Sequence, residues 1–167
     1  MLVEIALHKR DLVEAEAYCE EAIELSRKIQ NRSEEAATLY YFANIHRKQD
    51  RLDEAISAAN QSLDYFQQMG NLRYQGILQL ELARIYRYSE NYKLAMAACE
   101  KSARIFNDLG DNIALVQILI LWGDCYQLLE EMENALQKWN AAKDLAIYLS
   151  NSTLVQMIKS RFEGTVL

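Results

Sequence analysis

The strongest constraint on the fold of this chain is an alanine that recurs every 40 residues, at Ala15, Ala55, Ala95 and Ala135. Small residues follow seven positions after each alanine, at Ala22, Ser62, Ser102 and Ala142. Apolar residues recur at offsets −3, +10 and +14 from the same alanines. These offsets fall on one face of an α-helix, so the pattern predicts one amphipathic helix repeated along the chain.

The composition predicts that the rest of each repeat is also helical. The 167 residues include no proline and only 5 glycines, while 51% are hydrophobic. A protein of many short strands needs more turn-forming residues than this. We therefore expect an all-α protein.

Helix boundaries recur with the same period. One position of each repeat holds a residue type that caps helix N-termini, namely Asn31, Asn71, Asp111 and Asn151. The residues directly before them are Gln30, Gly70, Gly110 and Ser150, and the two glycines suit the left-handed turn that ends a helix. Each repeat is therefore predicted to be a helix, a short turn, a second helix and another short turn.

This division gives one repeat domain over residues 1–167. Its predicted parts are a partial repeat 1–30, full repeats 31–70, 71–110 and 111–150, and a terminal capping helix 151–163. The partial repeat begins with a segment at residues 2–9 that is short and apolar on every side, so it fits a capping role less well than the C-terminal helix does. Apolar residues of the last helix are expected to cover the end of the array, as terminal repeats must.

The first helix of each full repeat carries a large residue, a small residue and then a ring, as in Phe42, Ala43 and His46. The small residue allows a neighbouring helix to approach closely. The segments LARIY (82–86) and WGDCY (122–126), each followed by an alanine on the second helix, resemble the tetratricopeptide repeat (TPR). The resemblance covers nearly the whole chain and implies a right-handed superhelical solenoid of antiparallel helix pairs.

Two departures from the TPR pattern bear on this interpretation. The period is 40 residues, where the common form has about 34, and the proline that usually ends the second helix is absent. The longer period is similar to that of the long TPR forms in kinesin light chains and bacterial peptide-sensing regulators. HEAT and armadillo arrays also repeat every 40 residues or so, and they are the alternative, although they do not predict the small residue followed by tyrosine.

Several function classes are excluded or disfavoured by the sequence. A net charge of −6 and a pI near 5.0 argue against nucleic acid and anionic membranes as partners. Nucleotide-binding, hydrolase and zinc-protease motifs are absent, and His46 occupies a packing position, so we expect no enzyme, no cofactor and no metal. The three cysteines lack metal-ligand spacing and indicate reduced thiols in the cytoplasm.

A second stripe on the first helices, at spacing i, i+4, i+7, is left free by the packing positions. In TPR proteins this stripe lines a concave groove that receives a peptide, and the resemblance implies the same role here. The predicted peptide-binding residues are Tyr40, Asn44, Arg47, Lys48, Arg84, Arg87, Tyr88, Ile120, Asp124 and Gln127. The arginines favour an acidic partner, and the apolar residues favour an apolar anchor on it.

The predicted function is therefore a non-catalytic protein-protein interaction module that binds a peptide or helix in its concave groove. The alternative is a sensor or regulatory segment of a larger signalling or transcription-regulating protein. Self-association through the apolar N-terminal end is a third interpretation. Internal pairing of the groove arginines with Glu81 and Asp124 would weaken the peptide-binding interpretation.

Overall fold

The computed structural model describes residues 11–163. Within that range the chain forms eight helices and no strand. The helices are α2 (Leu12–Lys28), α3 (Arg32–Lys48), α4 (Leu52–Gln68), α5 (Leu72–Tyr88), α6 (Tyr92–Asp108), α7 (Asn112–Leu128), α8 (Met132–Tyr148) and α9 (Ser152–Glu163). The apolar segment 2–9, with the predicted cap or self-association site, lies outside the described residues.

The turns between the helices all have the same geometry. One residue in each has a positive φ, in the left-handed region, at Gln30, Asp50, Gly70, Glu90, Gly110, Glu130 and Ser150. The next residue then donates its backbone N–H to a carbonyl of the preceding helix, as Asn71 does to Phe66 at 2.9 Å. This is the hydrogen-bond pattern that ends many helices at a left-handed residue. Glycine occupies only two of these positions, so the other turns place non-glycine residues in the left-handed region.

The predicted N-caps are confirmed. The side chains of Asn31, Asn71, Asp111 and Asn151 each accept a hydrogen bond from the backbone N–H three residues later, at 3.0–3.2 Å. These bonds satisfy donors that the first turn of a helix leaves free. The caps fix where α3, α5, α7 and α9 begin, and these are the helices that form the inner side of the array.

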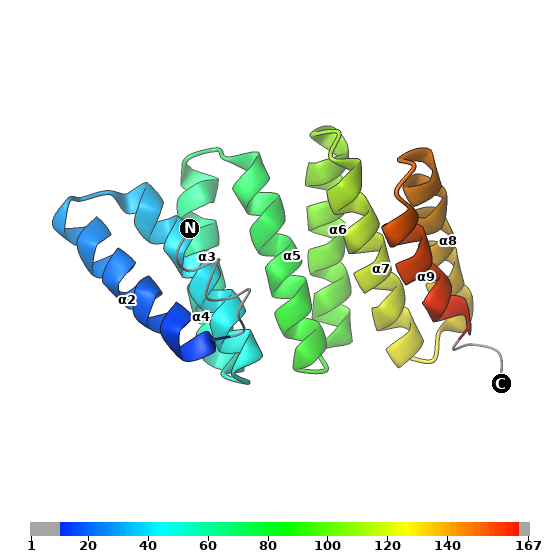
Figure 1. The fold of residues 1–167 in the computed structure, drawn as a ribbon, viewed down its shortest axis with the longest axis horizontal. Helices are drawn as coiled ribbons and strands as arrows, with labels where there is room; N and C mark the ends of the chain where they lie inside the picture. The colour runs from blue at the N-terminus through cyan, green and yellow to red at the C-terminus, as the bar shows by residue number, and fades with distance from the viewer. Residues whose placement is uncertain (1–10, 164–167) are drawn as a thin grey trace.

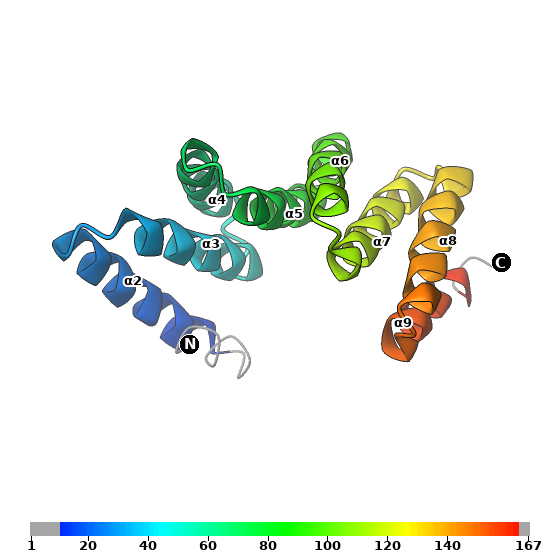
Figure 2. The same cartoon turned by 90° about the horizontal axis from the view of Figure 1, so that it is seen from above.

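The predicted all-α solenoid of antiparallel helix pairs is confirmed. Consecutive helices run in opposite directions and pack side by side from α2 to α9 (Figure 1). Seen from above, the array is curved, with α4 and α6 on the convex side and α3, α5 and α7 on the inner side (Figure 2). Direct contacts also join α3 to α5 and α5 to α7. The inner helices therefore form a continuous concave wall.

The core follows the alanine register, with one correction. All four register alanines are fully buried, and most residues at offsets +4, +7 and +11, such as Ala59, Ser62 and Phe66, are buried as well. The prediction that offsets +10 and +14 share this buried face was wrong for Leu25, Ile29, Met69 and Leu109, which are exposed. Offset +10 lies at the margin of the face, and the +14 residues are C-caps, where the helix has ended.

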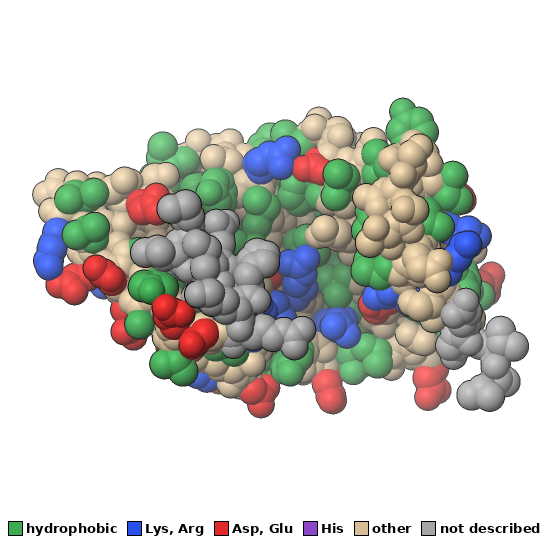
Figure 3. All heavy atoms as spheres, viewed as in Figure 1, with side chains coloured by type: hydrophobic (Ala, Val, Ile, Leu, Met, Phe, Trp, Pro, Cys, Tyr) green, Lys and Arg blue, Asp and Glu red, His purple; other side chains and the backbone are tan. Residues whose placement is uncertain are grey.

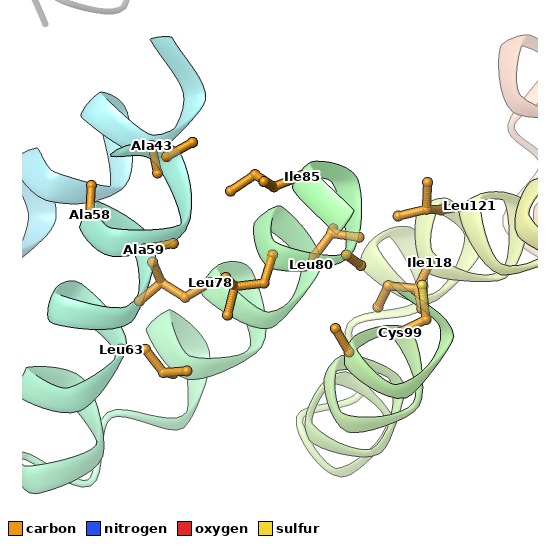
Figure 4. Close-up of a cluster of buried hydrophobic side chains, with 14 of the residues drawn as sticks. Ala43, Ala58, Ala59, Leu63, Leu78, Leu80, Ile85, Cys99, Ile118 and Leu121 are labelled. Atoms are coloured by element: carbon orange, nitrogen blue, oxygen red, sulfur yellow. The ribbon is translucent and has the colours of Figure 1, made fainter. Parts of the chain in front are cut away.

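Small residues let adjacent helices approach closely, as predicted. Ala43 and Ala83 are fully buried, and a Cβ on Gly123 would lie only 2.5 Å from the indole ring of Trp139. Ser62 and Ser102 are also buried and donate to the carbonyls of Ala36 and Gly76, at 2.6 and 2.8 Å. Figure 4 shows the central core, in which Ala43 of α3 and Ala59 of α4 lie toward larger side chains of α5, and Ile118 of α7 lies beside Cys99 of α6.

The packing role predicted for His46 is also observed. Its ring is mostly buried and meets Phe42 edge-on, with centroids 5.2 Å apart. Its Nε2 lies 3.4 Å from a Glu16 oxygen, in a geometry that falls short of a hydrogen bond. This contact joins α2 to α3.

The last helix, α9, covers the C-terminal end of the apolar core. Ile158 is fully buried, and Leu154, Val155 and Phe162 pack beside it. The Phe162 ring meets the buried Trp139 of α8 edge-on at 6.0 Å. This packing also brings Arg161 and Met157 to the concave side, next to α7.

Candidate functional site

The candidate site is the seam between α5 and α7 on the concave wall. Figure 3 looks onto this wall, where basic side chains gather near the centre and hydrophobic side chains border them. Two hollows follow the seam, and both are lined by Arg84 and Gln117. They therefore adjoin, one near the N-terminal halves of the two helices and one near their C-terminal halves.

The first hollow, called here the tyrosine hollow, has a volume of about 520 Å³. Its walls include Tyr40, Tyr41, Tyr74, Ile77, Phe106 and Ile113. Tyr74 stacks on Phe66 with centroids 4.1 Å apart, which fixes the orientation of its ring. This hollow is mainly aromatic and aliphatic, and it suits an apolar side chain.

A salt bridge forms one rim of the tyrosine hollow. Arg73 Nη1 lies 2.9 Å from Asp111 Oδ2 and links the first turns of α5 and α7. The pKa of Asp111 is lowered, first by the hydrogen bond from the backbone N–H of Ala114 and then by Arg73. Asp111 therefore stays ionised at neutral pH, and this rim adds no net charge to the seam.

The second hollow, called here the arginine hollow, has a volume of about 530 Å³. Four arginines from three helices line it, namely Arg47 of α3, Arg84 and Arg87 of α5, and Arg161 of α9. Its apolar wall is formed by Ile120, Leu121, Leu154 and Met157. Charged groups beside such a wall interact more strongly than in open water, because the local dielectric constant is lower.

Two of these arginines share one buried carboxylate. The Glu81 side chain is fully buried (0% exposed) and accepts from Arg47 Nε at 2.7 Å and from Arg84 Nη1 at 3.1 Å. Asn44 Nδ2 adds a longer hydrogen bond of 3.3 Å to the same carboxylate. The internal pairing with Glu81 that would weaken the peptide-binding interpretation is thus present for Arg47 and Arg84. Glu81 links α3 to α5 and orients both guanidinium groups.

The other two arginines differ in their pairing. Arg161 donates from Nε and Nη2 to the two oxygens of Asp124, at 2.8 and 3.1 Å, and Trp139 Nε1 also donates to Asp124 at 3.1 Å. Arg87 makes no ion pair within residues 11–163, and its solvent-shielded Nε has no hydrogen-bond acceptor there. Around this hollow four guanidinium groups therefore face two carboxylates, Glu81 and Asp124, which leaves two positive charges in excess.

The structure brings together six of the ten predicted site residues. Tyr40 lines the tyrosine hollow, Arg84 lines both hollows, and the arginine hollow is also lined by Arg47, Arg87, Ile120 and Asp124. Asn44 is half-buried, lines neither hollow and donates a hydrogen bond to Glu81. Lys48, Tyr88 and Gln127, near the last turns of their helices, line neither hollow.

Several lining residues were missed by the sequence prediction. Arg73 and Ile77, and likewise Ile113 and Gln117, continue the predicted stripes by two turns toward the helix N-termini, so the same spacing would have found them. Arg161 and Met157 lie on α9, which was interpreted only as a cap. Their part in the hollow depends on how α9 packs beside α7, and no local pattern shows that.

The thiols take no part in this site. Burial raises the pKa of Cys19 to about 12 and that of Cys125 to about 11, and it raises the pKa of Cys99 as well. All three cysteines are free and buried. They are therefore protonated at neutral pH and serve as core residues.

The curved helical array and its open seam define a class of protein, the helical-repeat interaction module. Within that class, residues 8–162 match the family model described as soluble NSF attachment protein, SNAP, and the chain belongs to this family. The match includes every helix from α2 to α8 and most of α9.

Other proteins are more distantly similar. The 43 kDa receptor-associated protein of the synapse from Tetronarce californica is 23% identical over 120 residues, which is 72% of this chain and 29% of that protein. The chain thus spans less than a third of this relative. The two names refer to attachment and to association with a receptor.

Two solved structures share the fold. BtubC (BKLC) from P. vanneervenii aligns with a TM-score of 0.74 and 16% identity over 88% of this chain and 62% of that one. A signal-transduction ATPase (STAND protein) with a tetratricopeptide repeat sensor, from Pyrococcus horikoshii, aligns with a TM-score of 0.75 and 17% identity over 94% of this chain and 24% of that one. These comparisons support TPR-like repeats, while the assignment to a long-repeat TPR form stays a prediction.

From α2 to α9, none of the helices combines the length and the apolar character that crossing a bilayer requires.

Proposed function

We propose that this chain is a non-catalytic module that binds a protein segment along the seam between α5 and α7, and that the segment carries acidic residues and an apolar anchor. The observation that carries the proposal is the excess of positive charge in the arginine hollow, directly beside the apolar tyrosine hollow. Arginine binds carboxylates through paired, charge-assisted hydrogen bonds, and aromatic walls provide rigid contact area.

The distance between the two hollows predicts how far apart the apolar anchor and the acidic residue of the ligand lie. Ile77 and Arg84, which line the two hollows, are seven positions apart on α5. Seven residues of α-helix rise about 10 Å, which corresponds to about three residues of extended peptide. The apolar anchor and the acidic residue are therefore expected about three residues apart if the segment binds in an extended conformation.

The wall that receives the segment is already formed by packed helices. Arg47 and Arg84 are fixed by Glu81, and Arg161 is fixed by Asp124. Little ordering of the protein is then needed when a partner binds, and this favours affinity.

The test is selection from a displayed library of random peptides, followed by fluorescence polarisation with the enriched sequences. We expect enrichment of Asp or Glu near an apolar residue, and at least tenfold weaker binding to Arg87→Gln. The matched control is Arg104→Gln on the convex helix α6, where the side chain is 75% exposed and pairs only with Glu100 among the described residues. Enriched peptides that lack acidic residues, or that bind both variants equally, would show that the seam is not the binding site.

A second candidate is a sensor or regulatory segment within a larger signalling or transcription-regulating protein. The similarity to an ATPase with a tetratricopeptide repeat sensor favours it. The two candidates are distinguished by the full-length gene product, because a regulatory segment would be joined to an effector domain whose activity changes when the seam is occupied.

A cytoplasmic location is proposed as well. It rests on the three free, buried thiols, since oxidising compartments favour disulfides. Imaging a fluorescent fusion of the full-length protein in its native cell would test the location.

A further inference from the structure

We infer that the arginine hollow is a subsite for a phosphorylated side chain, so that the partner segment of the proposed function is a phosphopeptide. This inference rests on the proposed function, because it assigns the anion that the same seam would bind. The chemical class is a phosphate monoester on serine or threonine of the partner.

The first argument is the number of charges. Four guanidinium groups face two carboxylates around this hollow, so the charge that remains to be neutralised is two. A single carboxylate would neutralise half of it. A phosphate monoester carries a charge of about −2 at neutral pH and matches it with one group.

The second argument is the direction from which the donors come. Arg47, Arg87 and Arg161 come from three different helices and surround one hollow. A carboxylate is planar and is matched by one guanidinium fork, whereas a phosphate presents three oxygens that point in different directions. Donors arranged around a hollow therefore suit the tetrahedral anion better than the planar one.

The third argument is the unsatisfied donor of Arg87. Its Nε is shielded from solvent and has no acceptor within residues 11–163, whereas Glu81 and Asp124 already accept from the other three arginines. A buried donor without an acceptor is unfavourable, and a ligand oxygen would satisfy it. Arg87 Nε is therefore assigned as the donor that gains a hydrogen-bond acceptor when the phosphate binds.

The apolar wall of the arginine hollow favours a phosphate that is attached to a peptide over a free anion. Ile120, Leu121, Leu154 and Met157 border the arginines. They exclude water around the ion pair, and they contact the backbone and neighbouring side chains of a bound segment. The tyrosine hollow adjoins at Arg84 and receives a further apolar side chain of the same segment.

The experiment uses three oriented peptide libraries passed over the immobilised full chain. Each library has degenerate flanking positions and a fixed centre, which is phosphoserine, serine or two adjacent glutamates. We expect the phosphoserine library to be retained at least tenfold more than either of the others. Individual phosphopeptides should lose at least tenfold in affinity with Arg87→Gln, and less with Arg87→Lys, which keeps the charge but removes the Nε donor.

Two controls accompany the libraries. Arg104→Gln on the convex face removes an arginine of the same kind and should leave phosphopeptide affinity within twofold of the parent. Thermal unfolding followed by circular dichroism should show that the Arg87 variants are folded.

The outcomes separate the two proposals. Retention of the diglutamate library equal to or above that of the phosphoserine library, with dependence on Arg87, would overturn the phosphate subsite and leave the acidic-peptide function standing. Both proposals fail if no library is retained, or if the Arg87→Gln variant retains the libraries as well as the parent does. Displacement of the phosphopeptide by an equal concentration of inorganic phosphate would show a site for a free anion and would also overturn the inference.

Discussion

At the scale of single residues, Glu81 lines neither hollow but fixes the positions of two arginines that do. Its carboxylate is fully buried, yet it is held by Arg47, Arg84 and Asn44. Removing a charge from water is unfavourable, and hydrogen-bonded opposite charges offset that penalty. The guanidinium groups remain partly exposed, Arg84 by 34%, so they are the ends of this network that a ligand would reach.

Arg47→Met is expected to destabilise the protein by about 2 kcal/mol, because it leaves the buried Glu81 with only Arg84 and Asn44 as partners. Adding Glu81→Leu should recover part of the loss, since no buried charge then remains, and Arg84 can be hydrated at the surface. Urea unfolding of the two variants and the parent gives the free energy of unfolding of each. A double variant less stable than Arg47→Met alone would mean that Glu81 contributes through something other than its charge.

At the scale of helices, the contact between α7 and α8 depends on one glycine. Gly123 lies against Trp139, and a Cβ there would approach the indole to 2.5 Å. Trp139 is itself fully buried between α7 and α9 and hydrogen-bonded to Asp124. The tryptophan therefore has no room to move away, and the helices would have to separate.

Gly123→Ala should destabilise the protein by about 1–3 kcal/mol through overpacking, although alanine is the better helix former. Trp139→Phe in the same chain should recover part of the loss, because the smaller ring leaves space for the new methyl group. Thermal unfolding of the single and double variants gives the comparison. If Gly123→Ala is neutral or stabilising, helix propensity outweighs the close approach, and the packing argument is wrong.

Features that depend on local sequence could be predicted for each helix, whereas features that depend on tertiary contacts could not. Capping residues and small residues act locally, so Asn71 and Ala83 could be assigned from their spacing alone. At offsets +10 and +14 half of the apolar residues are partly buried as predicted, but the C-cap residue Met69 is exposed because the helix has already ended there. Arg161 could not be assigned to the groove, since its place depends on a tertiary contact between α9 and α7.

At the scale of the whole molecule, the array is held together by neighbours. Among the described residues each helix packs mainly against the one before and the one after, with additional contacts between α3 and α5 and between α5 and α7, and with the Arg161–Asp124 ion pair joining α9 to α7. The apolar core accordingly divides into a central cluster over α3 to α7, a C-terminal cluster over α7 to α9, and a small cluster joining α2 to α3. In such an array stability is close to a sum of local terms, so damage at one end need not reach the other.

Ile158→Ala tests this locality because Ile158 is fully buried between α9 and the end of the array. Removing three carbons from a packed site is expected to destabilise the C-terminal cluster by about 2–4 kcal/mol. Hydrogen exchange followed by mass spectrometry should then show faster exchange in α8 and α9, while α3 and α4 exchange at the parent rate. The matched control is Leu63→Ala in α4, which lies in the central cluster and should give the opposite pattern. Equal acceleration in every helix for either variant would show that the molecule unfolds as one cooperative unit, and the groove would then be only as stable as its weakest end.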